Sequence, residues 1–228
     1  MRFAFKTANQ STTWPDVLEV WRAADQIEIF ESGWNFDHFY PIDGNAGGPC
    51  LEGWMMLAAL AQATTRLRMG TMVTGIHYRH PAVLANMIAT LDILSSGRLE
   101  VGVGAGWNEE ESGAYGIELG SRRERSDRFE EACEVLVGLL SQPEFSFQGR
   151  YYQLTGARND RRGRSVRILR SASAAEGKSG RCAPPRASPS TGTLLAPPRR
   201  SSPASGMSCT PTAPTSGATR ARSRCRRT

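Results

Sequence analysis

The aromatic side chains of this 228-residue chain are confined to its first two thirds. All 18 Trp, Tyr and Phe residues lie at or before Tyr152, and the segment 158–228 contains none. Charge divides the chain at the same place. Residues 1–157 carry 12 basic and 20 acidic side chains, a net charge of −8, whereas residues 158–228 carry 16 basic and 2 acidic side chains, a net charge of +14. We therefore expect a folded domain over residues 1–157 and a disordered basic tail over residues 158–228.

The sequence lacks the signals of a membrane or secreted protein. No segment reaches the roughly 18 consecutive apolar residues of a membrane span, and Met1–Phe3 opens a strand-like segment rather than a signal peptide. We expect a cytoplasmic protein without a membrane partner. Five cysteines are widely spaced and form no Cys-x-x-Cys pair, so reduced thiols are expected and no metal site is predicted.

Strand-like and helical patterns alternate along the first domain. Alternating or apolar runs predict strands over 2–8, 27–30, 67–73 and 98–104, and helical periodicity predicts helices over 13–24, 53–64, 80–94 and 126–140. A hairpin turning at Gln148-Gly149 is expected over 145–152. Four strand–helix units imply a parallel sheet, which is either doubly wound or part of an eight-stranded barrel. In both architectures the chemistry lies in the loops that follow the strands.

Two of those loops carry candidate site residues. Asp37 and His38 follow the second strand, and His38 could transfer a proton near neutral pH; alternatively, the pair only fixes the loop. Thr74 and Gly75 follow the third strand, where a glycine lets the backbone approach a ligand, although such a pair is also typical of a simple turn.

The loop after the fourth strand is rich in glycine. Gly102, Gly104 and Gly106 alternate, but the dinucleotide fingerprint Gly-x-Gly-x-x-Gly is not met, so a nicotinamide site is not favoured. The three glutamates 109–111 come next. Consecutive residues splay around a helix and no histidine lies near, so we interpret them as a solvated helix start rather than a metal site.

Four long motifs occur in an order that resembles a known family. Phe5–Trp14, Glu31–His38, Tyr78–Asn86 and Gly104–Gly116 together resemble the bacterial luciferase-like oxidoreductases, in particular the branch that uses coenzyme F420. The resemblance implies that residues 1–157 are the N-terminal half of a (β/α)8 TIM barrel, an α/β fold, with four β/α units. It also implies a deazaflavin at the C-terminal mouth that exchanges a hydride with a small organic substrate. An FMN-dependent monooxygenase of the same fold is the alternative, and a homodimer is compatible with the family.

The resemblance also implies roles for individual residues. The family's aspartate–histidine pair falls on Asp37 and His38, with His38 as the proton donor near the reactive edge of the ring. Trp107 stands where the sugar-phosphate dehydrogenases of the family place a catalytic glutamate, so that substrate is not expected. The positions implied to contact the cofactor are Asp37, Thr74 beside a strained peptide, Gly75, Ala105, Gly106 and Asn108.

The segment after Ala157 does not continue the family pattern. Suppose that one nucleotide was lost near residues 158–164. Codons compatible with Arg164–Cys182 then permit the sequence VRPHPPICLGGGGEKRTL in the restored reading frame, and this sequence contains the glycine-rich cofactor loop of the family. We therefore hypothesise a frameshift, and we expect weak cofactor binding, impaired activity and self-association of the chain as written. The basic tail as a nucleic-acid arm on a non-catalytic remnant is a further alternative. Because the tail lacks interleaved aromatic residues, we do not expect a nucleic-acid partner.

Overall fold

A computed structural model describes residues 3–159 and 167–170 of the chain. The predicted alternation of strands and helices is confirmed. Helix α1 begins after Thr13, whose side chain accepts a hydrogen bond from the Asp16 amide, and a proline occupies its first turn. The elements in chain order are β1 (Phe3–Lys6), α1 (Trp14–Asp25), β2 (Phe30–Asn35), α2 (Gly53–Ala63), β3 (Arg68–Thr71), β4 (Thr74–Gly75), α3 (Pro81–Leu94), β5 (Glu100–Gly104), α4 (Glu109–Ala114), α5 (Arg122–Ser141), β6 (Glu144–Gln148), β7 (Gln153–Arg158) and β8 (Arg167–Arg170).

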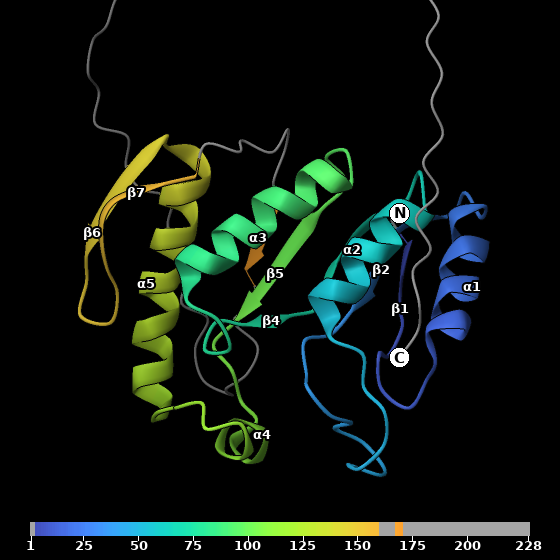
Figure 1. The fold of residues 1–228 in the computed structure, drawn as a ribbon, viewed down its shortest axis with the longest axis horizontal. Helices are drawn as coiled ribbons and strands as arrows, with labels where there is room; N and C mark the ends of the chain where they lie inside the picture. Colours follow the sequence, from blue (N-terminus) through green and yellow to red (C-terminus); the bar gives the residue numbers. More distant parts are fainter. Residues whose placement is uncertain (1–2, 160–166, 171–228) are drawn as a thin grey trace, which may run out of the picture. The chain divides into compact units, whose positions relative to one another are not determined.

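The barrel strands run parallel in two groups that adjoin each other. One sheet has the order β1-β2-β3 and the other has the order β4-β5-β8. Met69 in β3 forms a parallel bridge with Leu99, the residue directly before β5. The first sheet therefore adjoins the second through β3 and β5. The loop after β2 and helix α4 both lie beyond the C-terminal ends of these strands (Figure 1). This end of the sheet is therefore where a site is expected.

The second strand begins later than the sequence predicts. Residues 27–29 form a turn, with the Phe30 amide donating to the Ile27 carbonyl, and the strand extends from Phe30 to Asn35. Ile27 and Ile29 are exposed, whereas Gly33 to Asn35 are buried between β1 and β3. The prediction of a strand over 27–30 is therefore wrong except at Phe30, because residues 27–29 form the turn that precedes the buried part of β2.

Residues after Tyr152 also depart from expectation. The predicted hairpin exists, but its second strand, β7, follows Tyr152 and continues to Arg158. Arg167–Arg170, which falls in the predicted tail, forms strand β8 and pairs in parallel with β5. The remaining tail positions lie outside the described residues.

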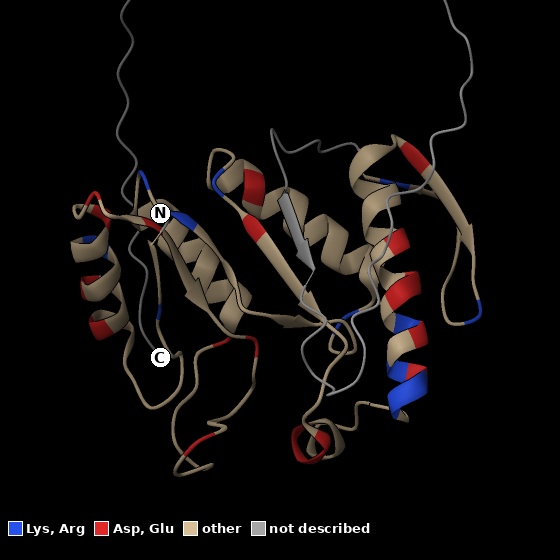
Figure 2. Cartoon of the chain, turned by 180° about the vertical axis from the view of Figure 1, so that it is seen from behind, with Lys and Arg blue, Asp and Glu red and all other residues tan. Residues whose placement is uncertain are grey.

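Helix α5 shows how the helices cover the core. Its start has a complete capping box, in which Ser121 accepts from the Glu124 amide and the Glu124 side chain accepts from the Ser121 amide. Charged residues are frequent between Arg122 and Glu134 of this helix (Figure 2), while Ala132, Val135 and Leu136 are buried in the core cluster. It packs against α3. None of the helices in the described part of the chain is long and apolar enough to cross a membrane.

We expect Gly70→Ala to destabilise the barrel wall. A Cβ at this position of β3 would lie 2.2 Å from the backbone oxygen of Glu100 in β5 and 2.7 Å from the Trp34 ring. Because a backbone atom cannot move aside without separating β3 from β5, the substitution should lower the free energy of unfolding by about 1–3 kcal/mol. Urea unfolding measures the loss. The matched control is Gly113→Ala in α4, where a Cβ meets nothing within 4 Å; equal stability changes in both variants would refute the close approach.

Candidate functional site

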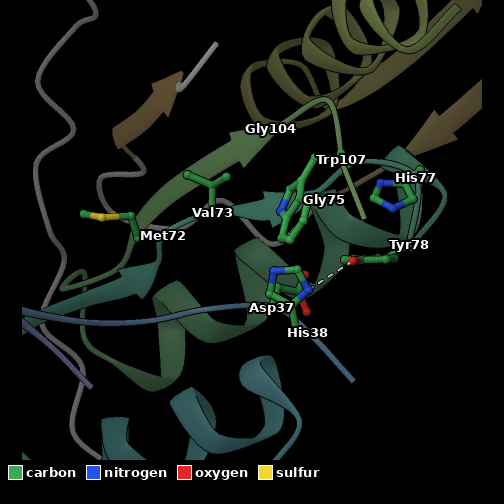
Figure 3. A pocket seen from close by; sticks show the side chains of 10 residues that line it. Asp37, His38, Met72, Val73, Gly75, His77, Tyr78, Gly104 and Trp107 are labelled. Atoms are coloured by element: carbon green, nitrogen blue, oxygen red, sulfur yellow. Dashed lines mark hydrogen bonds between the residues drawn. The ribbon is translucent and has the colours of Figure 1, made fainter. Parts of the chain in front are cut away.

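A cavity of about 260 Å³ opens at the C-terminal ends of β4 and β5. The loop after β2 supplies one wall, the loop after β4 supplies a second, and the glycine-rich loop after β5 supplies a third (Figure 3). Its lining residues are Asp37, His38, Met72, Val73, Gly75, His77, Tyr78, Gly104, Gly106 and Trp107.

Backbone forms much of one side of the cavity. Gly75 and Gly104 pair with each other across β4 and β5, and the peptide between Met72 and Val73, which is cis, lies at the same side. Gly106 adopts a φ of +88°, which favours glycine. Since these glycines carry no side chain, the cavity wall stays flat at this point.

A buried glutamate holds His38. Oε2 of Glu111 lies 2.8 Å from Nδ1 of His38 and accepts the hydroxyl of Tyr78, while Oε1 accepts the Phe39 amide at 2.7 Å. Glu111 is completely buried. The interpretation of residues 109–111 as a solvated helix start is therefore wrong for Glu111, although α4 does begin there. The N-cap Asn108 accepts the Glu111 amide at 3.1 Å and orients the helix so that its third residue faces inward.

The electrostatics of this cluster favour an ionised Glu111. Burial alone would raise the pKa of Glu111, but hydrogen bonds from His38, Tyr78 and the Phe39 amide lower it below its ordinary value. Burial and the bond to Glu111 raise the pKa of Tyr78, so its hydroxyl keeps its proton and acts as a donor. Glu111 is thus a carboxylate that accepts three hydrogen bonds.

Asp37 belongs to a second, separate cluster. Arg79 donates to both carboxylate oxygens of Asp37, at 2.5 Å and 2.9 Å, and to Oε1 of Glu52 at 2.6 Å. Burial raises the pKa of Asp37, and the hydrogen bonds and charge of Arg79 oppose that rise. Asp37 and His38 are adjacent in sequence, yet each is held by its own partner.

His77 is a third polar group at the cavity. Its Nε2 lies 3.3 Å from Oγ of Ser112, and its Nδ1 is buried without a hydrogen-bond partner. A Cβ on Gly106 would lie 2.4 Å from this nitrogen, which shows how closely the ring packs on the glycine loop. Burial lowers the pKa of His77 to about 4, so the ring is neutral at pH 7.

The structure brings four of the predicted site residues to the cavity: Asp37, His38, Gly75 and Gly106. The other three do not line it. Thr74 is buried, with Oγ1 bonded to Trp54 Nε1 at 3.0 Å and to Thr71 Oγ1 at 2.6 Å. Ala105 lies between two lining residues, Gly104 and Gly106, and Asn108 caps α4.

Sequence reasoning missed several residues of the site: Arg79, Glu111, His77 and Tyr78. Three of them lie in the Tyr78–Asn86 motif or next to it, which was used only as a family signal. Their sequence distances explain the omission, since Arg79 meets Asp37 across 42 positions and Glu111 meets His38 across 73. Such contacts are created by the fold and leave no local pattern.

Among the residues that the structure describes, no group of three or more His, Cys, Asp or Glu side chains could hold a metal ion. Cys50 is a free thiol. Burial raises the pKa of Cys50 to about 11, so it is no thiolate nucleophile at neutral pH.

Comparison with known proteins relates this arrangement to a family. The chain is 31% identical over 160 residues to an F420-dependent glucose-6-phosphate dehydrogenase of Amycolatopsis mediterranei, covering 69% of this chain and 47% of that protein. It is 37% identical over 133 residues to an F420-dependent hydroxymycolic acid dehydrogenase of Mycobacterium tuberculosis, covering 58% of this chain and 36% of that protein. The chain thus spans about half or less of the length of these relatives.

The fold comparison agrees. The structure of an F420-dependent secondary alcohol dehydrogenase, in complex with an F420-acetone adduct, superposes with a TM-score of 0.66 at 27% identity, covering 75% of this chain and 52% of that one. The predicted half-barrel fold and the family resemblance are thereby confirmed. Residues 1–174 match the family described as luciferase-like monooxygenase. The chain therefore belongs to the luciferase-like monooxygenase family.

Proposed function

We propose that the chain derives from an F420-dependent oxidoreductase and that the cavity at the ends of β4 and β5 receives the deazaflavin ring. The observation that carries the proposal is the position of His38. It lines the cavity at the carboxyl ends of the strands and is held by a buried carboxylate. The relatives named F420-dependent dehydrogenases support the choice of cofactor.

The cavity fits the ring of the cofactor better than its tail. A flat backbone surface at Gly75 and Gly104 faces the rings of His38 and Trp107 (Figure 3), which suits a planar aromatic body. The volume of about 260 Å³ lies just below the range of ligand pockets, roughly 300–1,000 Å³, so it holds a ring system rather than an entire cofactor. None of the described lining residues is Lys or Arg that could bind the phosphate.

Residues of this chain would contact the cofactor ring and transfer a proton to or from the substrate. When bound, F420 supplies the hydride acceptor or donor. Gly75, Gly104 and Gly106 present backbone to the ring. His38 is fixed through Nδ1 and would exchange a proton with the substrate through Nε2. The hydride would be transferred at the substrate carbon atom next to the group that gains or loses this proton. The indole of Trp107 lies 5.7 Å from the His38 ring in an edge-to-face arrangement and lines the same cavity.

We propose that a frameshift near residues 158–164 replaces the glycine-rich segment that would grip the phosphate, because codons compatible with Arg164–Cys182 permit that segment in another reading frame. Cofactor binding by the chain as written is then weak and turnover impaired. Re-sequencing of the gene across codons 150–170 tests the frameshift directly. The homodimer, the cytoplasmic location and the small organic substrate stay predictions.

We expect His38→Asn to abolish proton exchange without loss of cofactor binding. The asparagine amide can replace Nδ1–H as a donor to Glu111 but provides nothing in place of Nε2. In a barrel completed by restoring the reading frame, turnover should therefore fall by about 10²–10⁴-fold, the usual contribution of a general acid or base. F420 affinity, measured by fluorescence titration, should stay within a few-fold. Unchanged turnover would remove His38 from the reaction.

The FMN-dependent monooxygenase remains the second candidate function, because the same flat cavity would accept an isoalloxazine ring. The absorbance spectrum of the purified completed barrel separates the two. A deazaflavin spectrum supports the proposal, whereas bound FMN together with oxygen consumption would replace it.

A further inference from the structure

The short helix α4 contacts both pocket histidines through neighbouring residues. Glu111 bonds His38 through Nδ1, and Ser112 bonds His77 through Nε2. Asn108 anchors this helix at its start, because its side chain accepts the Glu111 amide and its carbonyl accepts the Ser112 hydroxyl. One turn of α4 therefore contacts Nδ1 of one imidazole and Nε2 of the other.

The partners of Glu111 decide which nitrogen of His38 carries the proton. Tyr78 and the Phe39 amide both donate to Glu111, and an ionised carboxylate has no proton to give. The 2.8 Å contact with His38 therefore requires a hydrogen on Nδ1. In the neutral ring, Nε2 then has a free lone pair.

The partners of Ser112 lead to the opposite result for His77. The single hydroxyl proton of Ser112 is donated to the Asn108 carbonyl at 2.7 Å. Its oxygen can then only accept at the 3.3 Å contact with His77, which places the hydrogen of that ring on Nε2. Nδ1, buried without a partner beside Gly106, is left as an unprotonated acceptor.

We propose that Glu111 is the positioning residue of this site and that α4 fixes the two histidines in opposite tautomers, Nδ1–H in His38 and Nε2–H in His77. Nε2 of His38 is thereby kept ready to receive a proton in the cavity. The role of this nitrogen rests on the proposed function, but the tautomers do not. Glu111 acts through His38 and does not itself meet the substrate.

The tautomers can be read directly by NMR, because the chain contains only three histidines, His38, His77 and His80. The full chain, labelled with ¹⁵N in histidine, is measured at pH 7.5 by long-range ¹H–¹⁵N correlation, with single histidine variants to assign the signals. We expect the Nδ1–H pattern for His38 and the Nε2–H pattern for His77 in the same spectrum. An Nε2–H pattern for His38 would overturn the proposal without any variant.

The variant Glu111→Gln tests whether Glu111 fixes the Nδ1–H tautomer of His38. A glutamine offers one acceptor oxygen to three donors, so His38 should lose the Nδ1–H pattern as its main form while His77 keeps Nε2–H. The matched control is Glu110→Gln, which alters an exposed neighbour in the same turn and should leave both histidines unchanged. Retention of the Nδ1–H pattern in Glu111→Gln would show that another group holds the ring.

A second variant covers the case in which Glu111→Gln does not fold. Tyr78→Phe removes the other contact of Nδ1, at 3.5 Å, and leaves Glu111 in place. The Nδ1–H pattern should persist in this variant, and its loss would assign the role to Tyr78 instead. F420 titration of the same samples distinguishes the two claims, because absence of F420 binding with the expected tautomers would contradict only the proposed function.

Discussion

Arg79→Met should lower the free energy of unfolding by about 3–5 kcal/mol, the usual cost of leaving one charge of a buried pair without its partner. Arg79 makes two hydrogen bonds to Asp37, whose side chain is 1% exposed, and a third to Glu52. Burial raises the pKa of Asp37, and without the arginine the carboxyl group must either stay charged in a poorly solvated position or take up a proton. Urea unfolding at pH 7 measures the difference.

Two further variants identify the buried charge as the cause. Glu52→Gln removes the more exposed partner, at 38% exposure, and should cost less than about 1 kcal/mol. Asp37→Asn combined with Arg79→Met removes both charges and should recover part of the stability lost in Arg79→Met alone. A change of less than about 1 kcal/mol in Arg79→Met would contradict the importance of this pair for the loop that carries His38.

Acidification from pH 6.5 to pH 4 should destabilise the protein through His77. Its pKa is about 4 in the folded state because of burial, whereas an unfolded histidine titrates near 6.5. Between these values the unfolded chain binds a proton that the folded chain does not, so stability falls as the pH falls. The shift corresponds to at most about 3 kcal/mol, fully lost below pH 4.

Comparison with His77→Gln isolates this contribution. The variant should show a flatter dependence of the urea midpoint on pH between 6.5 and 4, because glutamine does not titrate and can still donate to Ser112. His80→Asn is the control, since His80 is exposed and its capping role at the start of α3 can be taken over by asparagine. The same slope in wild type and His77→Gln would show that His77 is protonated without cost in the folded state.

The sequence predicted the alternation of elements because helical periodicity and capping signals are local. Proline and capping residues located the starts of α1 and α3 well. Strand β2 was misplaced because the apolar run at Ile27 resembles a buried strand, while its true position depends on pairing with Phe3 in β1. The sequence did not predict strand β8, because its residues lie in a segment whose composition is typical of disorder.

The candidate site was predicted in part for the same reason. Asp37, His38 and the glycine loop lie at the ends of strands, where a parallel sheet places its chemistry. A run of three glutamates, in contrast, resembles a solvated surface, and only the turn of α4 separates the exposed Glu109 and Glu110 from the buried Glu111. The network that orients His38 depends on contacts across the fold, which the local sequence does not encode.

The most direct test of the central claim is a titration of the full chain, labelled with ¹⁵N in histidine, with F420 up to millimolar concentration. His38 and His77 line the cavity, whereas His80 is exposed outside it. F420 should shift the ring signals of His38 and His77 together, with a common weak affinity, and should leave those of His80 unchanged. Ring signals of His38 and His77 that respond to FMN but not to F420, or to neither, would contradict it.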